Sequence, residues 1–105
     1  MADKYIVIWE FEVRPTARAE FETIYGTDGD WAQLFRCSAQ FRGTKLIHDI
    51  ARPERYLTLD AWTSREALRD FKERYAAEYA ALDRQCEALT HRESLIGEFT
   101  VVSQE

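Results

Sequence analysis

The segment YLTLDAWTSRE at residues 56–66 joins the end of a strand to the start of a helix. In its first seven residues, the aliphatic side chains at 57, 59 and 61 alternate with those of Tyr56, Thr58, Asp60 and Trp62, as is typical of a strand. Thr63 and Glu66 then have the spacing of a capping box, which predicts a helix N-terminus. Neither face of the strand is polar along its length, so we expect it to lie in a sheet that is covered on both faces.

Further elements are expected on either side of this segment. Residues 5–13 alternate strongly and are apolar on both faces at first, so they predict a central strand. A loop at residues 52–55 with Pro53 predicts a hairpin. The pattern predicts, in chain order, a strand at 5–13, a helix at 16–25, a short helix with Trp31, Leu34 and Phe35, an irregular stretch at 36–43, strands at 45–51 and 56–62, a helix over 64–89 that can break near 75–76, and a strand at 95–102 interrupted by Gly97.

This βαββαβ order predicts an α+β, ferredoxin-like fold: an antiparallel four-stranded sheet with the helices on one face. The length of 105 residues fits one domain, 1–105. With a two-residue turn at Pro53 and Glu54, Ala51 would face Tyr56, and His48 would face Leu59. The uncovered face would then present Leu57, Leu59 and Ala61, which predicts a homodimer with two sheets stacked face to face.

Composition narrows the classes of partner. The net charge is −5 and the basic residues are dispersed, so neither nucleic acid nor a membrane surface is an expected partner. The longest apolar run, residues 5–9, is too short to span a bilayer. Residues 1–4 carry no signal-peptide pattern, which makes a cytoplasmic protein the expectation. Cys37 and Cys86 have no metal or redox spacing and are expected to be reduced.

The chain resembles the antibiotic-biosynthesis-monooxygenase (ABM) superfamily of dimeric α/β barrel proteins. The likeness rests on Val13-Arg14-Pro15 at the end of the first strand, on Asp60-Ala61-Trp62-Thr63-Ser64, and on Phe71 and Tyr79 in the following helix. It covers almost the whole chain and implies a pocket for a flat aromatic molecule between the sheet and the helices. The implied lining is Tyr56, Thr58, Asp60 and Trp62, with Phe21, Tyr25, Phe71 and Tyr75 as the roof and Trp9 and Phe11 as an extended floor.

The catalytic positions of the superfamily are mostly changed. Cofactor-free, quinone-forming members have an Asn four residues before the Trp and a Tyr six residues after it, where this chain has Thr58 and Leu68. Haem-degrading members use an Asn on the first strand and a His on the helix after the Trp. This chain contains no Asn, and its histidines are His48 and His91. Of either set, only Trp62 is present.

Asp60 is the candidate general base, because it shares a face with Trp62 and a desolvated carboxyl has a raised pKa. The alternatives are that Asp60 is a structural residue paired with a nearby Arg or with the hairpin backbone, and that Trp62 is a core side chain. No metal site and no cofactor are expected. The resemblance implies a cofactor-independent monooxygenase acting on an aromatic or polycyclic small molecule. The alternatives are a non-catalytic small-molecule-binding or structural homodimer and, third, a haem-binding or haem-degrading protein.

Overall fold

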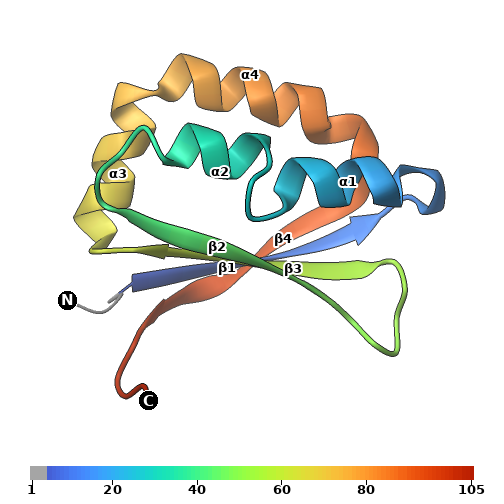
Figure 1. The fold of residues 1–105 in the computed structure, drawn as a ribbon. Coiled ribbons are helices and arrows are strands. Elements are labelled where there is room, and N and C mark those ends of the chain that lie inside the picture. Colours follow the sequence, from blue (N-terminus) through green and yellow to red (C-terminus); the bar gives the residue numbers. More distant parts are fainter. Residues whose placement is uncertain (1–4) are drawn as a thin grey trace.

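The computed structural model describes residues 5–105, and its elements follow the expected order (Figure 1). The expectation about residues 1–4 lies outside the described residues. The elements are β1 (Tyr5–Val13), a 3-10 turn η1 (Pro15–Ala17), α1 (Arg18–Tyr25), α2 (Asp30–Phe35), β2 (Phe41–His48), β3 (Arg55–Trp62), α3 (Arg65–Arg74), α4 (Ala76–Cys86), a second 3-10 turn η2 (Glu87–Leu89) and β4 (Thr90–Thr100).

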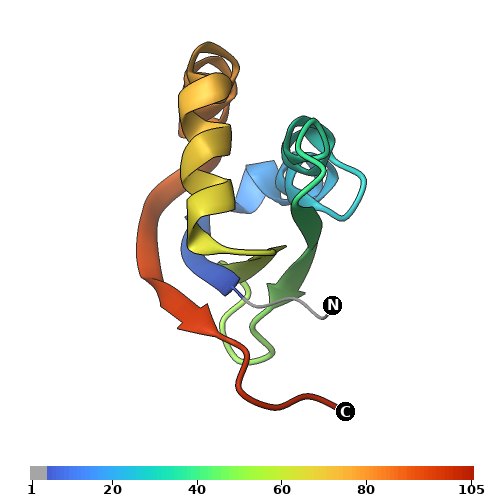
Figure 2. The same cartoon turned by 90° about the vertical axis from the view of Figure 1, so that its left-hand side faces the viewer.

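The strands form one antiparallel sheet in the order β2-β3-β1-β4, and the helices lie on one face of it (Figure 2). This is the expected ferredoxin-like α+β fold, with β1 inside the sheet. The helix over residues 64–89 divides at Tyr75 into α3 and α4, where a break was considered. Within residues 5–105, no helix is long and apolar enough to cross a membrane.

The register of β1 and β3 decides which side chains face the helices. Tyr5 lies opposite Trp62, Val7 opposite Asp60, Trp9 opposite Thr58 and Phe11 opposite Tyr56. Side chains of directly opposed residues project from the same face of a sheet, so all eight share the helix-covered face. This covered face therefore carries both the aromatic core and Asp60.

The hairpin prediction was wrong in position and register. The first of its strands is β2 at Phe41–His48 rather than 45–51, and His48 pairs with Tyr56. The Asp49 carboxylate accepts hydrogen bonds from the backbone N–H groups of Ala51 (2.8 Å) and Arg52 (3.1 Å), which closes a turn and ends the strand early. His48 therefore stacks on the Tyr56 ring, with 4.1 Å between centroids, instead of facing the uncovered side beside Leu59.

Residues 36–43 are only partly irregular, because β2 begins at Phe41. Gly43 has φ of 116°, a conformation that side chains other than Gly rarely adopt. The register shifts between Phe41 and Gly43, which is the signature of a bulge. The bulge lets Phe41 lie opposite Trp62 while Thr44 lies opposite Asp60.

The last strand begins five residues earlier than expected. β4 spans Thr90–Thr100 rather than 95–102, because polar residues 90–94 pair with the second half of β1. Arg92 forms an ion pair of 3.7 Å with Glu12 across this pairing. The register shifts at Ile96, beside Gly97, where an irregularity was predicted.

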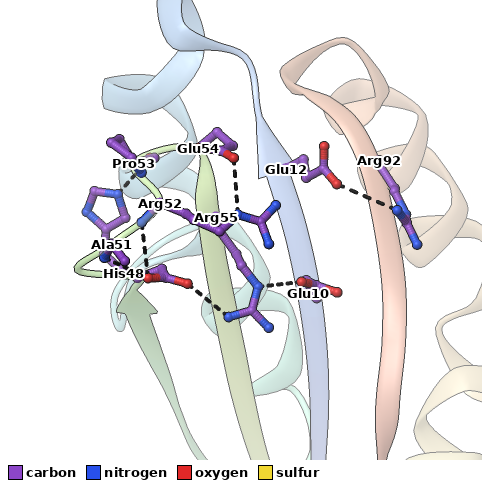
Figure 3. Close-up of polar contacts among 10 residues, drawn as sticks. Glu10, Glu12, His48, Ala51, Arg52, Pro53, Glu54, Arg55 and Arg92 are labelled. Atoms are coloured by element: carbon purple, nitrogen blue, oxygen red, sulfur yellow. Dashed lines mark hydrogen bonds and ion pairs between the residues drawn. The ribbon is translucent and has the colours of Figure 1, made fainter.

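The uncovered face of the sheet has a charged end and an apolar remainder. At the charged end, Arg55 bonds to Glu10 and, at 3.1 Å, to Asp49, and Arg92 pairs with Glu12 (Figure 3). Elsewhere the face carries one exposed charged side chain, Lys45 opposite Leu59, among aliphatic and aromatic side chains that are half-buried or exposed: Ile6, Ile8, Ile47, Leu57, Leu59, Ala61 and Phe99.

Candidate functional site

Two cavities lie between the sheet and the helices and share part of their walls. The larger has a volume of about 540 Å³ and lies against α3 and α4, whereas the smaller, of about 280 Å³, extends toward α1 and α2. Both are bounded by aromatic side chains with a few polar groups, as ligand pockets commonly are. The residues common to both are Trp9, Phe35, Asp60, Lys72 and Tyr79.

Asp60 contributes a carboxyl to this shared wall. It accepts a hydrogen bond of 2.6 Å from the Thr44 hydroxyl on the neighbouring strand. Burial raises the pKa of Asp60 to about 6, against the opposing effects of the Thr44 hydrogen bond and the Lys72 charge. A carboxyl with this pKa is mostly ionised at neutral pH and is a much stronger base than an exposed aspartate.

Two tyrosines border the smaller cavity as neutral phenols. Burial, followed by the carboxylates of Asp83, Asp60 and Glu93, raises the pKa of Tyr79 to about 12. The pKa of Tyr25 is also raised, chiefly by burial. Both hydroxyls therefore keep their protons near neutrality and can donate hydrogen bonds to a ligand, but they are not available as bases.

Six of the site residues predicted from the sequence lie in the cavity walls. They are Trp9, Phe11, Tyr25, Thr58, Asp60 and Trp62. Phe21, Tyr56, Phe71 and Tyr75 line neither cavity and are packed against other rings. Phe21 stacks on Tyr25 at 4.2 Å between centroids, and Phe71 packs between Trp62 (5.3 Å) and Tyr75 (5.1 Å). Phe21 and Phe71 therefore support the walls from behind, and Tyr56 and Tyr75 pack against these two rings in turn.

The charged residues of the walls were missed by the sequence analysis. Arg65, Arg69 and Lys72 of α3 border the larger cavity, and Lys72 also borders the smaller one. Their spacing of four and then three residues places them on one face of the helix, which is a signal that was available in the sequence. Glu93 and Glu98 could not be found in this way, because the strand that carries them was not recognised at residues 90–94 and its register depends on the bulge.

Tyr5, Glu98 and Arg65 interact at one end of the larger cavity. The Tyr5 hydroxyl donates a hydrogen bond of 2.7 Å to Glu98, and the Arg65 guanidinium pairs with the same carboxylate at 2.9 Å. Burial and this hydrogen bond raise the pKa of Tyr5 to about 12, while the pKa of Glu98 is lowered. The Glu98 carboxylate is thus committed to contacts within the protein.

Neither histidine is placed to ligate a group in these cavities. His48 is exposed and its Nε2 lies 2.7 Å from the Pro53 carbonyl oxygen, while His91 is exposed at the start of β4. Among residues 5–105, no group of three or more His, Cys, Asp or Glu side chains is positioned to hold a metal ion. The wall tyrosines, with their raised pKa values, are poor haem ligands because ligation requires phenolate. The lining residues therefore do not fit haem ligation.

No protein-family model matches the chain, and no curated protein matches it. Solved structures do match over nearly its full length. A variant of SnoaB, a cofactor-independent oxygenase from Streptomyces nogalater, is 24% identical with a TM-score of 0.73, covering 98% of this chain and 97% of its own. A putative antibiotic biosynthesis monooxygenase from Bordetella bronchiseptica is 19% identical with a TM-score of 0.74, covering 97% and 100%.

A variant of MhuD with two manganese protoporphyrin IX molecules bound per active site is 26% identical, with a TM-score of 0.73, covering 96% of this chain and 97% of its own. All three are similar along the whole βαββαβ order rather than over one motif. The resemblance drawn from the strand-end Trp62 and its neighbours is therefore confirmed: the chain has the fold of the ABM superfamily.

Proposed function

We propose that this protein is a cofactor-independent monooxygenase that oxidises a phenolic polycyclic aromatic compound with O2. The observation that carries the proposal is the Asp60 carboxyl, which has a pKa of about 6 and stands in an aromatic wall common to two cavities. The similarity to SnoaB, described as a cofactor-independent oxygenase, supports the same chemistry.

The reaction begins with proton transfer to Asp60. A hydroxyanthrone illustrates the substrate class, because its enol form is a phenol whose anion is electron-rich. Asp60 takes the hydroxyl proton, the anion passes one electron to O2, and the resulting radical pair combines at the ring carbon. Loss of water then gives the quinone: one oxygen atom of O2 enters the product, the other leaves as water, and the ring CH2 group becomes C=O.

The walls provide the surroundings that this sequence of steps needs. Trp62 has no exposed surface and borders the larger cavity, so it excludes water from the anion and the radical pair. Thr58 and Leu68, which replace the Asn and Tyr of the quinone-forming members, border the smaller and larger cavity respectively. Neither side chain can accept a proton near neutral pH. Asp60 is the base in this proposal because, of the carboxylates bordering the smaller cavity, it alone also borders the larger one.

Oxygen uptake with a hydroxyanthrone tests the proposal. We expect the protein to consume one O2 for each quinone formed, at a rate proportional to protein concentration and well above the buffer reaction. The measurement combines an oxygen electrode with absorbance of the quinone. Binding of the anthrone, seen as quenching of tryptophan fluorescence, without any O2 uptake above buffer would instead support a non-catalytic binding protein.

We also propose that the protein forms a homodimer through the uncovered sheet face. Ile47 and Phe99 are 43% and 46% exposed on that face, next to half-buried Leu59 and Ala61. An apolar sheet face of this kind is normally packed against a second layer. A two-fold related copy would cover it with an identical surface.

Replacing Leu59 with Glu tests this interface. The substitution places two carboxylates, one from each subunit, in an apolar contact, and we expect it to raise the dimer dissociation constant by about a hundredfold or more. Light scattering coupled to size exclusion measures the change. Ala77→Glu adds the same charge at an exposed position of α4 and serves as the control. A Leu59→Glu protein that is folded and as dimeric as this control would contradict the proposed interface.

A further inference from the structure

Lys72 lies where the two cavities meet, and its ammonium makes no direct ion pair with another described residue. Its Nζ is 5.4 Å from the centre of the Tyr79 ring, which itself borders both cavities. Among residues 5–105, no carboxylate comes within ion-pair distance of Lys72, whereas Arg65 on the same helix face is paired with Glu98. The Lys72 ammonium is thus free to interact with a bound molecule.

The Lys72 ammonium offsets the negative charges that surround the smaller cavity. Asp60 from β3, Asp83 from α4 and Glu93 from β4 border it, and Lys72 is the one cation among its described lining residues. Partial burial, with Asp83 and Glu87 as neighbours, raises the pKa of Glu93. Carboxylates alone would oppose ionisation of a phenol in this space, so an anionic ligand depends on Lys72.

We propose that Lys72 stabilises the ionised oxygen of the aromatic ligand at the junction of the cavities, so that the site takes acidic phenols and enols as their anions. The inference rests on the proposed function, because Asp60 is the group that receives the proton. The O–H bond of the ligand breaks, its proton moves to the Asp60 carboxylate, and a phenolate and a neutral carboxylic acid result. Lys72 takes no part in this proton transfer.

The other polar and charged groups near the junction of the cavities cannot supply the positive charge that Lys72 supplies. On α3, Arg69 and Glu73 border only the larger cavity and carry opposite charges, and Glu98 of β4 is neutralised by Arg65. The Tyr25 and Tyr79 hydroxyls are neutral donors, and the Thr44 hydroxyl already donates to Asp60. In addition, Leu68 has no polar group at the position where quinone-forming members have Tyr. Lys72 is therefore the group that supplies positive charge to the smaller cavity among its described lining residues.

A hydroxyanthraquinone dye tests the proposed role of Lys72 without requiring turnover. The dye changes colour when its phenol ionises, and it is already a quinone and is not oxidised by O2. The dye is titrated with protein at a pH about one unit below its own pKa, and the visible spectrum of the bound form is recorded. Tryptophan fluorescence measures binding separately. The variants are Lys72→Met, Lys72→Arg and, as a control, Arg74→Met, which removes one positive charge from an exposed position of the same helix outside both cavities. Lys72 is exposed, so its replacement leaves the core intact.

We expect the native protein and Arg74→Met to hold the dye mainly as its anion. Lys72→Met should raise the pKa of the bound dye by about one unit, which is about tenfold less anion, and Lys72→Arg should restore most of it. Dye bound as the neutral phenol to the native protein, or an anion fraction unchanged in Lys72→Met, would overturn the inference while leaving oxygen uptake by the native protein as evidence for the proposed function. If the native protein does not bind the dye, the inference is overturned, and oxygen uptake with the hydroxyanthrone decides the proposed function separately.

Discussion

An Asp60→Asn protein is expected to lose O2 uptake with a hydroxyanthrone by a factor of about a hundred to ten thousand, the usual contribution of a general base. The amide has nearly the shape of the carboxyl, and its oxygen can still accept the hydrogen bond that the Thr44 hydroxyl donates at 2.6 Å. What it lacks is a site for the substrate proton. The fold and the cavities should therefore persist while the first chemical step fails.

The pH dependence provides an internal check on the same residue. Because the pKa of Asp60 is raised to about 6, the native rate should increase about tenfold per pH unit below pH 6 and become level above it. The residual rate of Asp60→Asn should lack this transition. Asp70→Asn, an identical change at an exposed position of α3 outside both cavities, is the control. Uptake by Asp60→Asn within about tenfold of that control would rule out Asp60 as the base.

As the pH rises from about 4 to 6, the ionisation of Asp60 should lower the stability of the folded protein while it raises the rate of O2 uptake. A carboxyl whose folded pKa lies above its unfolded value of 3.8 binds its proton more tightly in the folded state. The folded protein therefore loses stability as pH rises from about 4 to 6, and it does not regain it above 6. Asp60→Asn removes this loss, so its melting temperature at pH 7 should be no lower than that of the native protein.

Trp62→Ala is expected to lower the free energy of unfolding by about 3–5 kcal/mol, the typical cost of truncating a fully buried aromatic side chain. Trp62 is 0% exposed and packs against Phe35, Phe41 and Phe71, with ring centroids 5.2–5.5 Å away. Its indole N–H has no hydrogen-bond partner among residues 5–105, so the loss comes from packing and burial alone. Urea unfolding monitored by circular dichroism measures it.

Trp9→Ala is the matched comparison, since Trp9 lies on the same sheet face but is half-buried and borders both cavities. A smaller loss of stability is expected there because less of the side chain leaves the core. If Trp62→Ala is too unstable to purify, Trp62→Phe keeps most of the packing and should still cost measurable stability. Equal costs for the Trp9 and Trp62 truncations would show that Trp62 does not have the central packing role assigned to it.

The parts of the fold that follow from residue pattern were predictable. Alternation along residues 5–13 and 56–62 gave the correct shared face for Tyr5, Phe11, Asp60 and Trp62, because the side-chain direction repeats every two residues. The hairpin register was not predictable in this way. It depends on the Asp49 carboxylate binding two backbone N–H groups, an interaction that overrides the apparent turn at Pro53.

Only part of the candidate site could be predicted, because the direction of a side chain does not show whether it borders a cavity. An apolar stripe shows that Phe21 and Phe71 point inward, but it does not show whether an inward side chain borders empty space or fills it. Trp9 borders the cavities, whereas Phe71 meets Trp62 and Tyr75 and closes the space between them. Lys72 was not predicted as a site residue, because charged residues beside an apolar stripe usually lie on the solvated side of a helix.

The bulge of β4 at Ile96 also bears on how the protein avoids aggregation. β4 is an edge strand, and Leu95, Ile96 and Phe99 are all exposed along it, at 48%, 46% and 46%. A regular strand with these residues would be a template for pairing with another unfolded or partly folded chain. The extra residue disrupts the spacing of the free backbone groups, so an incoming strand can match only one side of Ile96 at a time. The irregular edge should therefore disfavour the joining of partly folded chains into extended sheets.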